Sequence, residues 1–313
     1  MKNKFYVIIP TYNRTEKLKR AIDSVLEQQY DNYEIYIVDD CSKNNGKDNK
    51  ELINSYNSEK IKYFYINKNR GHCYARNYAL EQIKEDSAWV KYLDDDDLIL
   101  DNCLSIFNDV INENVNVNVI TSNYIKVIDD KQEVKETDYT KYSVFKGKLD
   151  TCAICHSIAL YKKIGGWNER LFRMADDDFF FKYISNGNYV YCNKTLSVFY
   201  ATNDEDRVTN QVGNLKYCNI IADKYDYFKR FGKCCVITTD EIFAELYNVD
   251  FPIETFIQFD YIEKGKETNT EKYNIVIFLS NPEDLVDIFF VINDTEQTYF
   301  SCNNSICILK SGN

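Results

Sequence analysis

The stretch Ala88-Trp89-Val90-Lys91-Tyr92-Leu93-Asp94-Asp95-Asp96-Asp97-Leu98 joins a short, mostly apolar run directly to four consecutive carboxylates. The run is typical of a buried strand, and open α/β sheets bind ligands at the carboxyl edge where such strands end. Four adjacent anions repel one another, and a hard divalent cation such as Mg²⁺ or Mn²⁺ is their natural compensator. A bent chain could aim Asp94 and Asp96 at one ion. The alternative is a solvated acidic loop in which Asp97 caps the next helix.

Short apolar runs alternate with amphipathic segments up to this point. Strands are predicted over 5–9, 34–38, 61–66 and 88–93. Helices are predicted to begin near Thr15, over 50–56 and after Gly71, with apolar residues at helical spacing. This order predicts a parallel α/β sheet covered by helices on both faces. Polar residues follow every strand, and loop composition alone would not gather four such clusters at one edge.

Farther along, the pattern continues and then changes. The elements predicted next are a helix over 102–110, a strand over 115–122, a hairpin over 124–139, a helix beginning at 176–178 and a strand over 196–200. After about residue 212 only a helix over 216–231 and short apolar runs between polar turns are found. We therefore divide the chain into a first domain, 1–212, and a C-terminal helix with a small α+β appendage of unknown role, 213–313.

Composition and net charge limit the binding partners and the cellular compartment that we expect for this protein. The chain has 313 residues, a formal net charge of −11 and eleven cysteines. The acidic balance argues against nucleic acid as a partner and gives no general affinity for an anionic membrane. No export signal precedes Pro10, and the apolar run 288–292 is too short to cross a bilayer. Free thiols and a cytoplasmic location are therefore expected.

One cysteine spacing requires a separate interpretation. Cys152-Ala153-Ile154-Cys155-His156 has the spacing of a covalent haem attachment site. Haem attachment requires export, which nothing else in the sequence supports. A zinc site would need a second pair of ligands, and His72 is the only other histidine. We interpret this segment as structural.

Five segments carry motifs that belong together: 8–14 (IIPTYNR), 37–42 (IVDDCS), 69–77 (NRGHCYARN), 93–97 (LDDDD) and 165–187 (beginning GGWNE). In this order and spacing they resemble the inverting nucleotide-sugar glycosyltransferases of family 2, over about residues 5–210. The resemblance implies the GT-A fold, a Rossmann-like, mostly parallel sheet with helices on both faces. The sequence departs from the family at Cys41, where Gly or Asn is usual.

The resemblance implies a donor site at the carboxyl edge of the sheet. The residues that it places on the nucleotide-sugar donor are Pro10, Thr11, Tyr12, Arg14, Asp39, Asp40, Asn69, Gly71, Arg76, Asp94, Asp95 and Arg207. Tyr12 would stack on the base, Asp39 would accept a hydrogen bond from it, and Arg76 would neutralise phosphate or orient the acidic loop. Asp94 and Asp96 would hold Mn²⁺ or Mg²⁺ against the diphosphate.

Inversion at the anomeric carbon requires a general base opposite the leaving group. In the family this base is the Asp of a Glu-Asp pair. Counting back from Gly187 aligns Ala175 with the Glu and makes Asp176 the base, which we prefer. The other register makes Asp177 the base. For the remaining members of the triplet Asp176-Asp177-Asp178, the alternative role is capping of a helix N-terminus. The acceptor side would be formed by Gly166, Trp167, Asn168 and Glu169.

The resemblance therefore predicts a metal-dependent, inverting hexosyl or N-acetylhexosaminyl transferase. Its donor would be a nucleoside-diphosphate sugar, preferably a UDP-sugar, bound by residues 1–100. Residues 101–212 would bind the acceptor, a glycan or glycolipid, and the reaction would belong to polysaccharide or glycoconjugate biosynthesis. If the acceptor is lipid-linked, the protein would also make peripheral contact with the cytoplasmic face of a membrane. A non-catalytic sugar-nucleotide-binding relative is the alternative. A nucleotidyltransferase or dinucleotide-binding enzyme is disfavoured because the turn 10–15 lacks glycine.

Overall fold

The Asp run (Asp94–Asp97) lies in the first of two compact units, Met1–Arg207 and Val208–Asn313, in the computed structural model of the chain. The structure describes residues 2–128, 131–138, 150–171 and 175–201, together with the strands of the second unit. Within these ranges no helix combines the length and the apolar character that crossing a bilayer requires.

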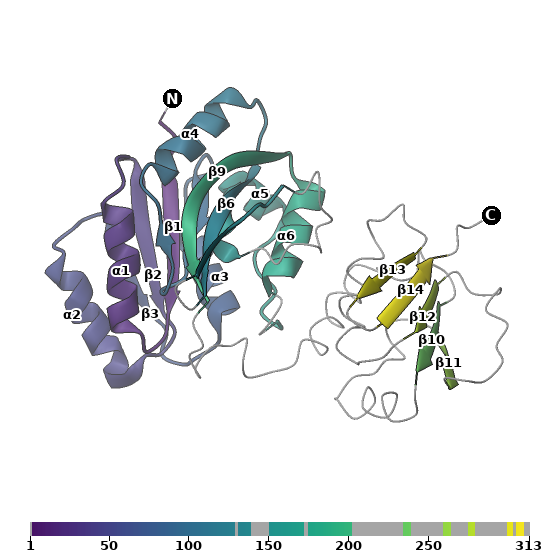
Figure 1. Ribbon diagram of the computed structural model, residues 1–313. Helices are drawn as coiled ribbons and strands as arrows, with labels where there is room; N and C mark the ends of the chain where they lie inside the picture. Colours follow the sequence, from purple (N-terminus) through teal and green to yellow (C-terminus); the bar gives the residue numbers. More distant parts are fainter. Residues whose placement is uncertain are drawn as a thin grey trace. The chain divides into compact units, whose positions relative to one another are not determined.

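The first unit is built on a nine-stranded sheet in the order β3-β2-β1-β4-β8-β6-β9-β5, with β7 paired to β6. Figure 1 labels β1, β2, β3, β6 and β9 of this sheet. Its strands are β1 (Phe5–Thr11), β2 (Tyr33–Asp39), β3 (Ile61–Tyr65), β4 (Trp89–Tyr92), β5 (Leu98–Ile99), β6 (Val119–Ile128), β7 (Lys131–Lys135), β8 (Ile154–Ser157) and β9 (Tyr189–Tyr200). β1 pairs in parallel with β2 and β4, and β2 pairs in parallel with β3. These pairings confirm the parallel block predicted for the first strands. Beyond β4 the sheet is mixed, because β8 is antiparallel to both β4 and β6.

Helices connect the strands of this sheet and cover it. They are α1 (Thr15–Leu26), α2 (Lys47–Ser55), α3 (His72–Gln82), α4 (Cys103–Glu113), α5 (Ile158–Ile164) and α6 (Ala175–Asn186), with 3₁₀ turns η1 (Lys43–Gly46) and η2 (Thr151–Ala153). α1 buries Leu18, Ala21, Ile22 and Val25, the apolar positions at helical spacing. The amphipathic pattern therefore predicted this helix and its buried face correctly.

The main hydrophobic core fills the space between the sheet and the helices α1 and α4. Phe5, Val7 and Ile9 of β1 belong to it, together with Leu18 of α1 and Phe107 of α4. Successive side chains of a strand point to opposite faces, so the intervening residues of β1 face away from this core. α3 contacts β1 and β2 but contributes no residue to this core. Helices thus cover both faces of the parallel block, as predicted.

The predictions fail mainly at the ends of elements. The strand predicted over 115–122 begins only at Val119. Val115 is 88% exposed, and Asn116 has a φ of 69°, a left-handed conformation that interrupts extended pairing. The strand predicted over 196–200 is the end of the longer β9. The antiparallel pair β6–β7 confirms the predicted hairpin.

The second unit contains a separate five-stranded sheet in the order β11-β10-β12-β14-β13. Its strands are β10 (Cys234–Thr238), β11 (Phe259–Glu263), β12 (Ile275–Phe278), β13 (Tyr299–Cys302) and β14 (Ser305–Leu309). β10 is parallel to β11 and β12, whereas β14 is antiparallel to β12 and β13. The helix predicted over 216–231 and the apolar run 288–292 lie outside the described residues. The predicted assignment of roles to 1–212 and 213–313 stays a prediction.

Candidate active site

The carboxyl ends of β1, β2 and β4 meet at one edge of the first sheet. In the parallel register Thr11 lies opposite Asp39, and Ile8 lies opposite Tyr92. The Leu93 N–H then donates to the Ile8 carbonyl oxygen at 3.0 Å, so the Asp run leaves β4 beside the end of β1. The polar clusters predicted after these strands therefore share the edge at which open α/β sheets bind ligands.

The chain turns sharply at the Asp run, and each of the four carboxylates contacts another group of the protein. The Asp97 N–H donates to the Asp94 carbonyl oxygen at 3.1 Å, which closes the turn. The Asp94 carboxylate lies 2.5 Å from the Arg76 guanidinium. Asp95 accepts a hydrogen bond from Thr11 Oγ1 at 2.7 Å. The run is therefore fixed to both β1 and α3.

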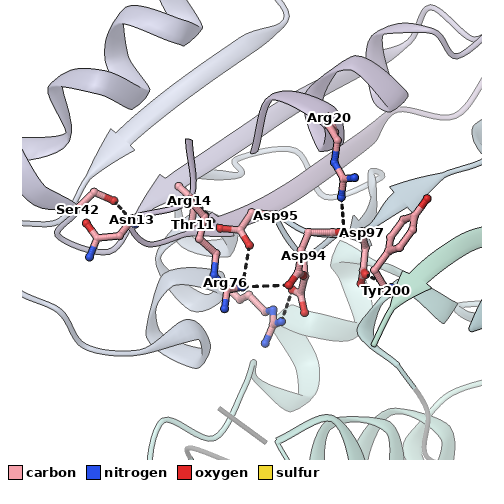
Figure 2. Close-up of polar contacts among 11 residues, drawn as sticks. Thr11, Asn13, Arg14, Arg20, Ser42, Arg76, Asp94, Asp95, Asp97 and Tyr200 are labelled. Carbon is pink, nitrogen blue, oxygen red and sulfur yellow. Dashed lines mark hydrogen bonds and ion pairs between the residues drawn. The ribbon is translucent and has the colours of Figure 1, made fainter. Parts of the chain in front are cut away.

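The second half of the run is fixed to the loop after β1 and to β9. The Arg14 guanidinium lies 3.1 Å from the Asp96 carboxylate and 3.3 Å from that of Asp95. Asp97 Oδ1 accepts the backbone N–H of Tyr200 at 3.0 Å. Figure 2 shows Arg14 on the Asp95 side of the run and Tyr200 on the Asp97 side. Arg14 thus contacts two of the four carboxylates, while Asp94 and Asp97 have separate partners.

Burial divides the run into two kinds of carboxylate. The Asp94 and Asp96 side chains are 31% and 14% exposed, whereas Asp95 and Asp97 are buried. Burial raises the pKa of Asp95 to about 7, and repulsion from Asp96 acts in the same direction. Burial also acts to raise the pKa of Asp94, but the Arg76 guanidinium holds it below its ordinary value. An ion arriving from solvent would therefore meet Asp94 and Asp96, the pair predicted to bind metal.

Arg76 of α3 is a buried cation with unused donors. Its side chain is 3% exposed, and NH2 also donates to Thr151 Oγ1 at 3.4 Å. The guanidinium carbon lies 4.4 Å from the centroid of the Trp167 ring. Nε and NH1 have no hydrogen-bond partner among the described residues. A buried guanidinium with unpaired donors is costly, and an anion such as phosphate would satisfy them.

The loop before α3 is held by Asp40. The two oxygens of its carboxylate accept the N–H groups of Arg70 at 2.9 Å and Gly71 at 2.6 Å. Gly71, the N-cap of α3, has a φ of 90°, which glycine adopts at little cost. Burial raises the pKa of Asp40. Asp40 therefore positions α3 and with it Arg76, while Asn69 of the same loop is exposed.

Asp39 is completely buried, and both of its oxygens accept hydrogen bonds from within the protein. Oδ1 accepts the Ser42 N–H at 2.7 Å. Oδ2 accepts from Asn49 Nδ2 and from the Tyr63 hydroxyl, each at 2.7 Å. The carboxylate thereby ties the loop after β2 to α2 and β3, and its predicted contact with a nucleotide base stays a prediction.

The loop after β1 presents an exposed aromatic ring. Pro10 is buried within β1, whereas Tyr12 is 47% exposed and can stack on a base. Asn13 joins this loop to its neighbour. Its N–H donates to Ser42 Oγ at 2.8 Å (Figure 2). Its Oδ1 accepts the Lys43 N–H at 2.8 Å. The exposed ring therefore stands on a fixed loop.

Asp176, in the first turn of α6, is connected to the same edge. Its Oδ1 accepts a hydrogen bond from Thr151 Oγ1 at 2.7 Å, and Thr151 is also contacted by Arg76. Burial raises the pKa of Asp176, and the positive charge of Arg76 opposes this rise. Asp178 is completely buried. The Asp177 side chain lies outside the described residues, so the choice between Asp176 and Asp177 as the base stays a prediction.

The segment predicted to face the acceptor is fastened to α3. The Asn77 side chain accepts the Trp167 N–H at 2.7 Å and donates to the Trp167 carbonyl oxygen at 2.9 Å. Trp167 is 4% exposed, and a Cβ on Gly166 would lie 2.2 Å from Asn77 Oδ1. Trp167 is therefore a packing residue. Gly166 and Asn168 are half-buried and Glu169 is exposed, so solvent reaches these three members of the segment.

The turn η2 brings residues to the site that the sequence analysis did not propose for it. Asp150 is the N-cap of this turn, and burial, with repulsion from Asp176, raises its pKa to about 8. Thr151 follows, between Arg76 and Asp176. No local pattern reveals these roles, because η2 reaches the site only through the insertion of β8 between β4 and β6. The predicted donor residue Arg207 lies outside the described residues.

The Cys152–His156 spacing does not form one set of ligands. Cys155 belongs to the core beside α1 and α4. His156, the next residue of β8, packs on Tyr183 with ring centroids 4.6 Å apart. Its Nε2 lies 2.9 Å from the Tyr92 hydroxyl and its Nδ1 3.0 Å from a backbone carbonyl oxygen, which assigns the proton to Nδ1. Burial lowers the pKa of His156 to about 3, so it is a neutral packing residue.

Comparison with known proteins identifies the family. The family model described as Glycosyl transferase family 2 matches residues 6–165, just over half of the chain. The chain belongs to glycosyl transferase family 2. The resemblance found in the sequence motifs is thereby confirmed.

Sequence relatives of this family 2 protein include two bacterial glycosyltransferases. An uncharacterized glycosyltransferase of Rickettsia conorii is 29% identical over 189 residues, which are 56% of this chain and 30% of that protein. The putative colanic acid biosynthesis glycosyl transferase WcaA of Escherichia coli is 37% identical over 101 residues, 32% of this chain and 35% of that protein. The match thus covers only about a third of the length of each relative.

Solved structures of Staphylococcus aureus TarS have the same fold. TarS 1–349 in complex with UDP-GlcNAc gives a TM-score of 0.60 at 21% identity, covering 71% of this chain and 65% of that one. A second structure of TarS 1–349 gives a TM-score of 0.55 at 25% identity, covering 70% of this chain and 64% of that one. The predicted fold class, an α/β sheet of the GT-A type, is confirmed.

Proposed function

We propose that this family 2 protein transfers a sugar from a nucleoside-diphosphate sugar to an acceptor hydroxyl with inversion at the anomeric carbon. One observation carries the proposal: contacts run without a break from Asp94 through Arg76 and Thr151 to Asp176. This series of contacts, the Asp94–Asp176 chain, has a candidate metal ligand and a phosphate-binding cation at one end. It has a candidate general base at the other. Transfer between two bound substrates needs both ends in one site.

The donor end suits a nucleotide diphosphate. Arg14 and Arg76 bring two guanidinium groups to the carboxyl edge of the sheet, and guanidinium binds phosphate through paired hydrogen bonds. The exposed Tyr12 ring offers a face for the base. We propose a UDP-sugar as the donor, carrying a hexosyl or N-acetylhexosaminyl group. The complex of TarS with UDP-GlcNAc, on the same fold, supports that class.

Asp94 and Asp96 fit a hard divalent cation, Mn²⁺ or Mg²⁺. They are the accessible pair of the run, and such ions take carboxylate oxygens together with substrate phosphate. When bound, the ion would neutralise the charge that develops on the leaving diphosphate. Arg14 and Arg76 contact these same carboxylates, so the protein supplies positive charge of its own at that place.

Asp176 is the proposed base. In the transfer the acceptor oxygen attacks the anomeric carbon from the face opposite the diphosphate, and its proton passes to the Asp176 carboxylate. The bond between the anomeric carbon and the diphosphate oxygen breaks, and the electron pair leaves with the nucleoside diphosphate. A carboxylate whose pKa is raised by burial is a better proton acceptor than an ordinary one.

We propose a glycan or glycolipid as the acceptor, in polysaccharide or glycoconjugate biosynthesis. The name of the Escherichia coli relative, putative colanic acid biosynthesis glycosyl transferase, supports this assignment. The exposed Glu169 and the half-buried Asn168 lie on the segment that would face such an acceptor. A cytoplasmic location with peripheral contact at a membrane that carries the acceptor is part of the same proposal.

The test compares donor turnover by the Asp176→Asn and Asp177→Asn variants. Asp176→Asn should bind UDP with unchanged affinity but lose at least about a hundredfold in turnover, because a base contributes roughly 10²–10⁴. Asp177→Asn should stay near the wild type. The reverse result would move the base to Asp177. Wild-type protein that binds UDP but turns over no sugar nucleotide would identify a non-catalytic relative.

A further inference from the structure

Asp97 is the member of the Asp run that the proposed donor site does not use. Its side chain is completely buried. Oδ1 accepts the Tyr200 N–H at 3.0 Å, but Oδ2 has no hydrogen-bond partner among the described residues. A buried carboxylate oxygen without a donor is costly, and proteins usually satisfy such an atom with a donor or a cation.

The Asp97 carboxylate lies beside two further potential ligands. Asp97, Asp150 and Cys152 each offer one ligand atom, and these atoms all lie within 4.8 Å of one another. In the part of the chain that the structure describes, this is the only group of three or more Asp, Glu, His or Cys residues so placed. Cys152 is completely buried and Asp150 is partly exposed, so solvent can approach from the Asp150 side.

The charges around this cluster favour a cation. Asp94 and Asp176 repel the Asp150 carboxylate, and Asp94 also repels that of Asp97. Two buried cations contact η2: Lys91 donates from Nζ to a carbonyl oxygen of this turn, and Arg76 donates to Thr151 Oγ1. Arg76 is already paired with Asp94. The charge of Lys91 does not balance two carboxylates and a thiolate, whereas a divalent ion together with this lysine would.

We propose that Asp97, Asp150 and Cys152 form a second cation site, selective for a borderline-soft divalent metal of the Zn²⁺ class. A thiolate beside two carboxylates suits Zn²⁺, while Mg²⁺ and Mn²⁺ prefer oxygen ligands alone. The pair Asp94 and Asp96 offers only oxygen, so the two sites would differ in metal preference. Water from the exposed side would complete the coordination.

The bound ion would act as a structural clamp. It would connect the turn before β5, which carries Asp97, to η2, which carries Cys152 and is capped by Asp150. Through the Tyr200 N–H it would also fix β9. Because η2 contains Thr151, the clamp would hold one link of the Asp94–Asp176 chain. The proposal stands on this geometry and does not depend on the reaction being glycosyl transfer.

Cobalt is a probe that reports thiolate ligation directly. The full-length chain is freed of metal with a chelator and titrated with Co²⁺, and the sulfur-to-cobalt charge-transfer absorption is recorded. The wild type should show the band, and Zn²⁺ should displace Co²⁺ and remove it. Cys152→Ala should abolish the band. Cys155→Ala, a substitution of a buried cysteine in β8 outside the cluster, should retain it, and so should Asp96→Ala.

A second variant keeps the test decisive if Cys152→Ala does not fold. Asp150 is partly exposed, and Asp150→Asn should fold while binding Co²⁺ roughly tenfold more weakly or worse. Zn²⁺ should raise the Tm of the wild type and not that of Asp150→Asn. A wild type without the band, a band lost in Cys155→Ala instead, or unchanged Co²⁺ affinity in Asp150→Asn would overturn the proposal. If the Co²⁺ and Tm results are as expected but the protein transfers no sugar, the proposed function fails and the second cation site stands.

Discussion

Thr151 links the two halves of the candidate active site through one hydroxyl. Its Oγ1 donates to Asp176 at 2.7 Å and accepts from Arg76 at 3.4 Å. The hydrogen bond favours the charged form of Asp176 and so lowers its pKa against the effect of burial. Thr151 would therefore act as a positioning residue that sets both the orientation and the proton affinity of the base.

Replacing this hydroxyl should change both rate and pH dependence. We expect Thr151→Val to lower kcat by on the order of ten- to a hundredfold, because the Asp176 carboxylate would lose the hydrogen bond that orients it toward the acceptor. The acidic limb of the kcat/KM profile should move to higher pH, since the pKa of Asp176 rises when the hydrogen bond is lost. Thr151→Ser should restore both properties. A Val variant with a wild-type pH profile would contradict this role.

Asp95 gives the site a pH dependence of its own. Its pKa is raised by burial to about 7 from an ordinary value of 3.8. A raised pKa means that the folded protein binds this proton more tightly than the unfolded chain does. The stabilisation is therefore complete below about pH 4 and is lost as pH rises toward 7. Above that pH the ionised carboxylate opposes folding unless a cation is present.

The Asp95→Asn variant isolates this effect, since it cannot ionise. In chelator, urea unfolding should show the variant more stable than the wild type by about 1–3 kcal/mol at pH 8. The difference should shrink toward pH 4. Asp101→Asn, at an exposed carboxylate nearby, serves as the control and should show no such trend. A stability difference that is the same at both pH values would refute the assignment to Asp95.

At the scale of elements, α3 organises the site. Neighbouring residues of this helix serve the two sides: Arg76 contacts Asp94 and Thr151, and Asn77 holds the backbone of Trp167. The helix itself is placed by the hydrogen bonds of Asp40 to the N-cap loop. Movement of α3 would therefore disturb the proposed donor and acceptor sides together.

The contact between α3 and the acceptor-side segment can be tested with a double-mutant cycle. Gly166→Ala should destabilise the protein by about 1–3 kcal/mol, because its Cβ would lie 2.2 Å from Asn77 Oδ1. Asn77→Ala removes that atom, so adding Gly166→Ala to it should cost much less. Urea denaturation of the four proteins measures the coupling. Additive effects would show that the clash is relieved elsewhere.

The sequence predicts those elements whose pattern is local. The apolar runs and amphipathic helices before Asp94 predicted the parallel block, and the polar residues after each strand predicted the edge that carries the site. The strand β5 has only two residues, too few for a periodic signal, and the four-residue strand β8 was not predicted. Their partners are distant in sequence, which is why the approach of Asp150 and Thr151 to the Asp run could not be predicted.

Individual roles within the site were harder to predict than its place. Asp39 follows β2 at the expected edge, yet Asn49 and Tyr63 already occupy one of its oxygens. Trp167 lies in the predicted acceptor segment but is buried. Cys41, the departure from the family, has a φ of 71°, a conformation that Gly or Asn adopts more easily. A sequence motif identifies which residues matter, but only packing decides whether a polar atom is still available.

At the scale of the whole molecule, electrostatics set the requirement for local cations. The chain carries a formal net charge of −11, so its overall field does not attract an anionic sugar nucleotide. Under the proposed function, the positive charge would come from the site, through Arg14, Arg76 and a divalent ion on Asp94 and Asp96. Removing the ion from so acidic a molecule should therefore weaken nucleotide binding strongly.

Calorimetric titration of UDP into the full chain, with Mn²⁺ and with chelator, tests this central claim most directly. The account predicts binding with Mn²⁺ that is lost in chelator and in Asp96→Ala but kept in the control Asp101→Ala. At a hundred times its Kd, UDP with Mn²⁺ should add about 2.7 kcal/mol to the stability. UDP affinity that is the same with and without Mn²⁺, or unchanged in Asp96→Ala, would contradict the account.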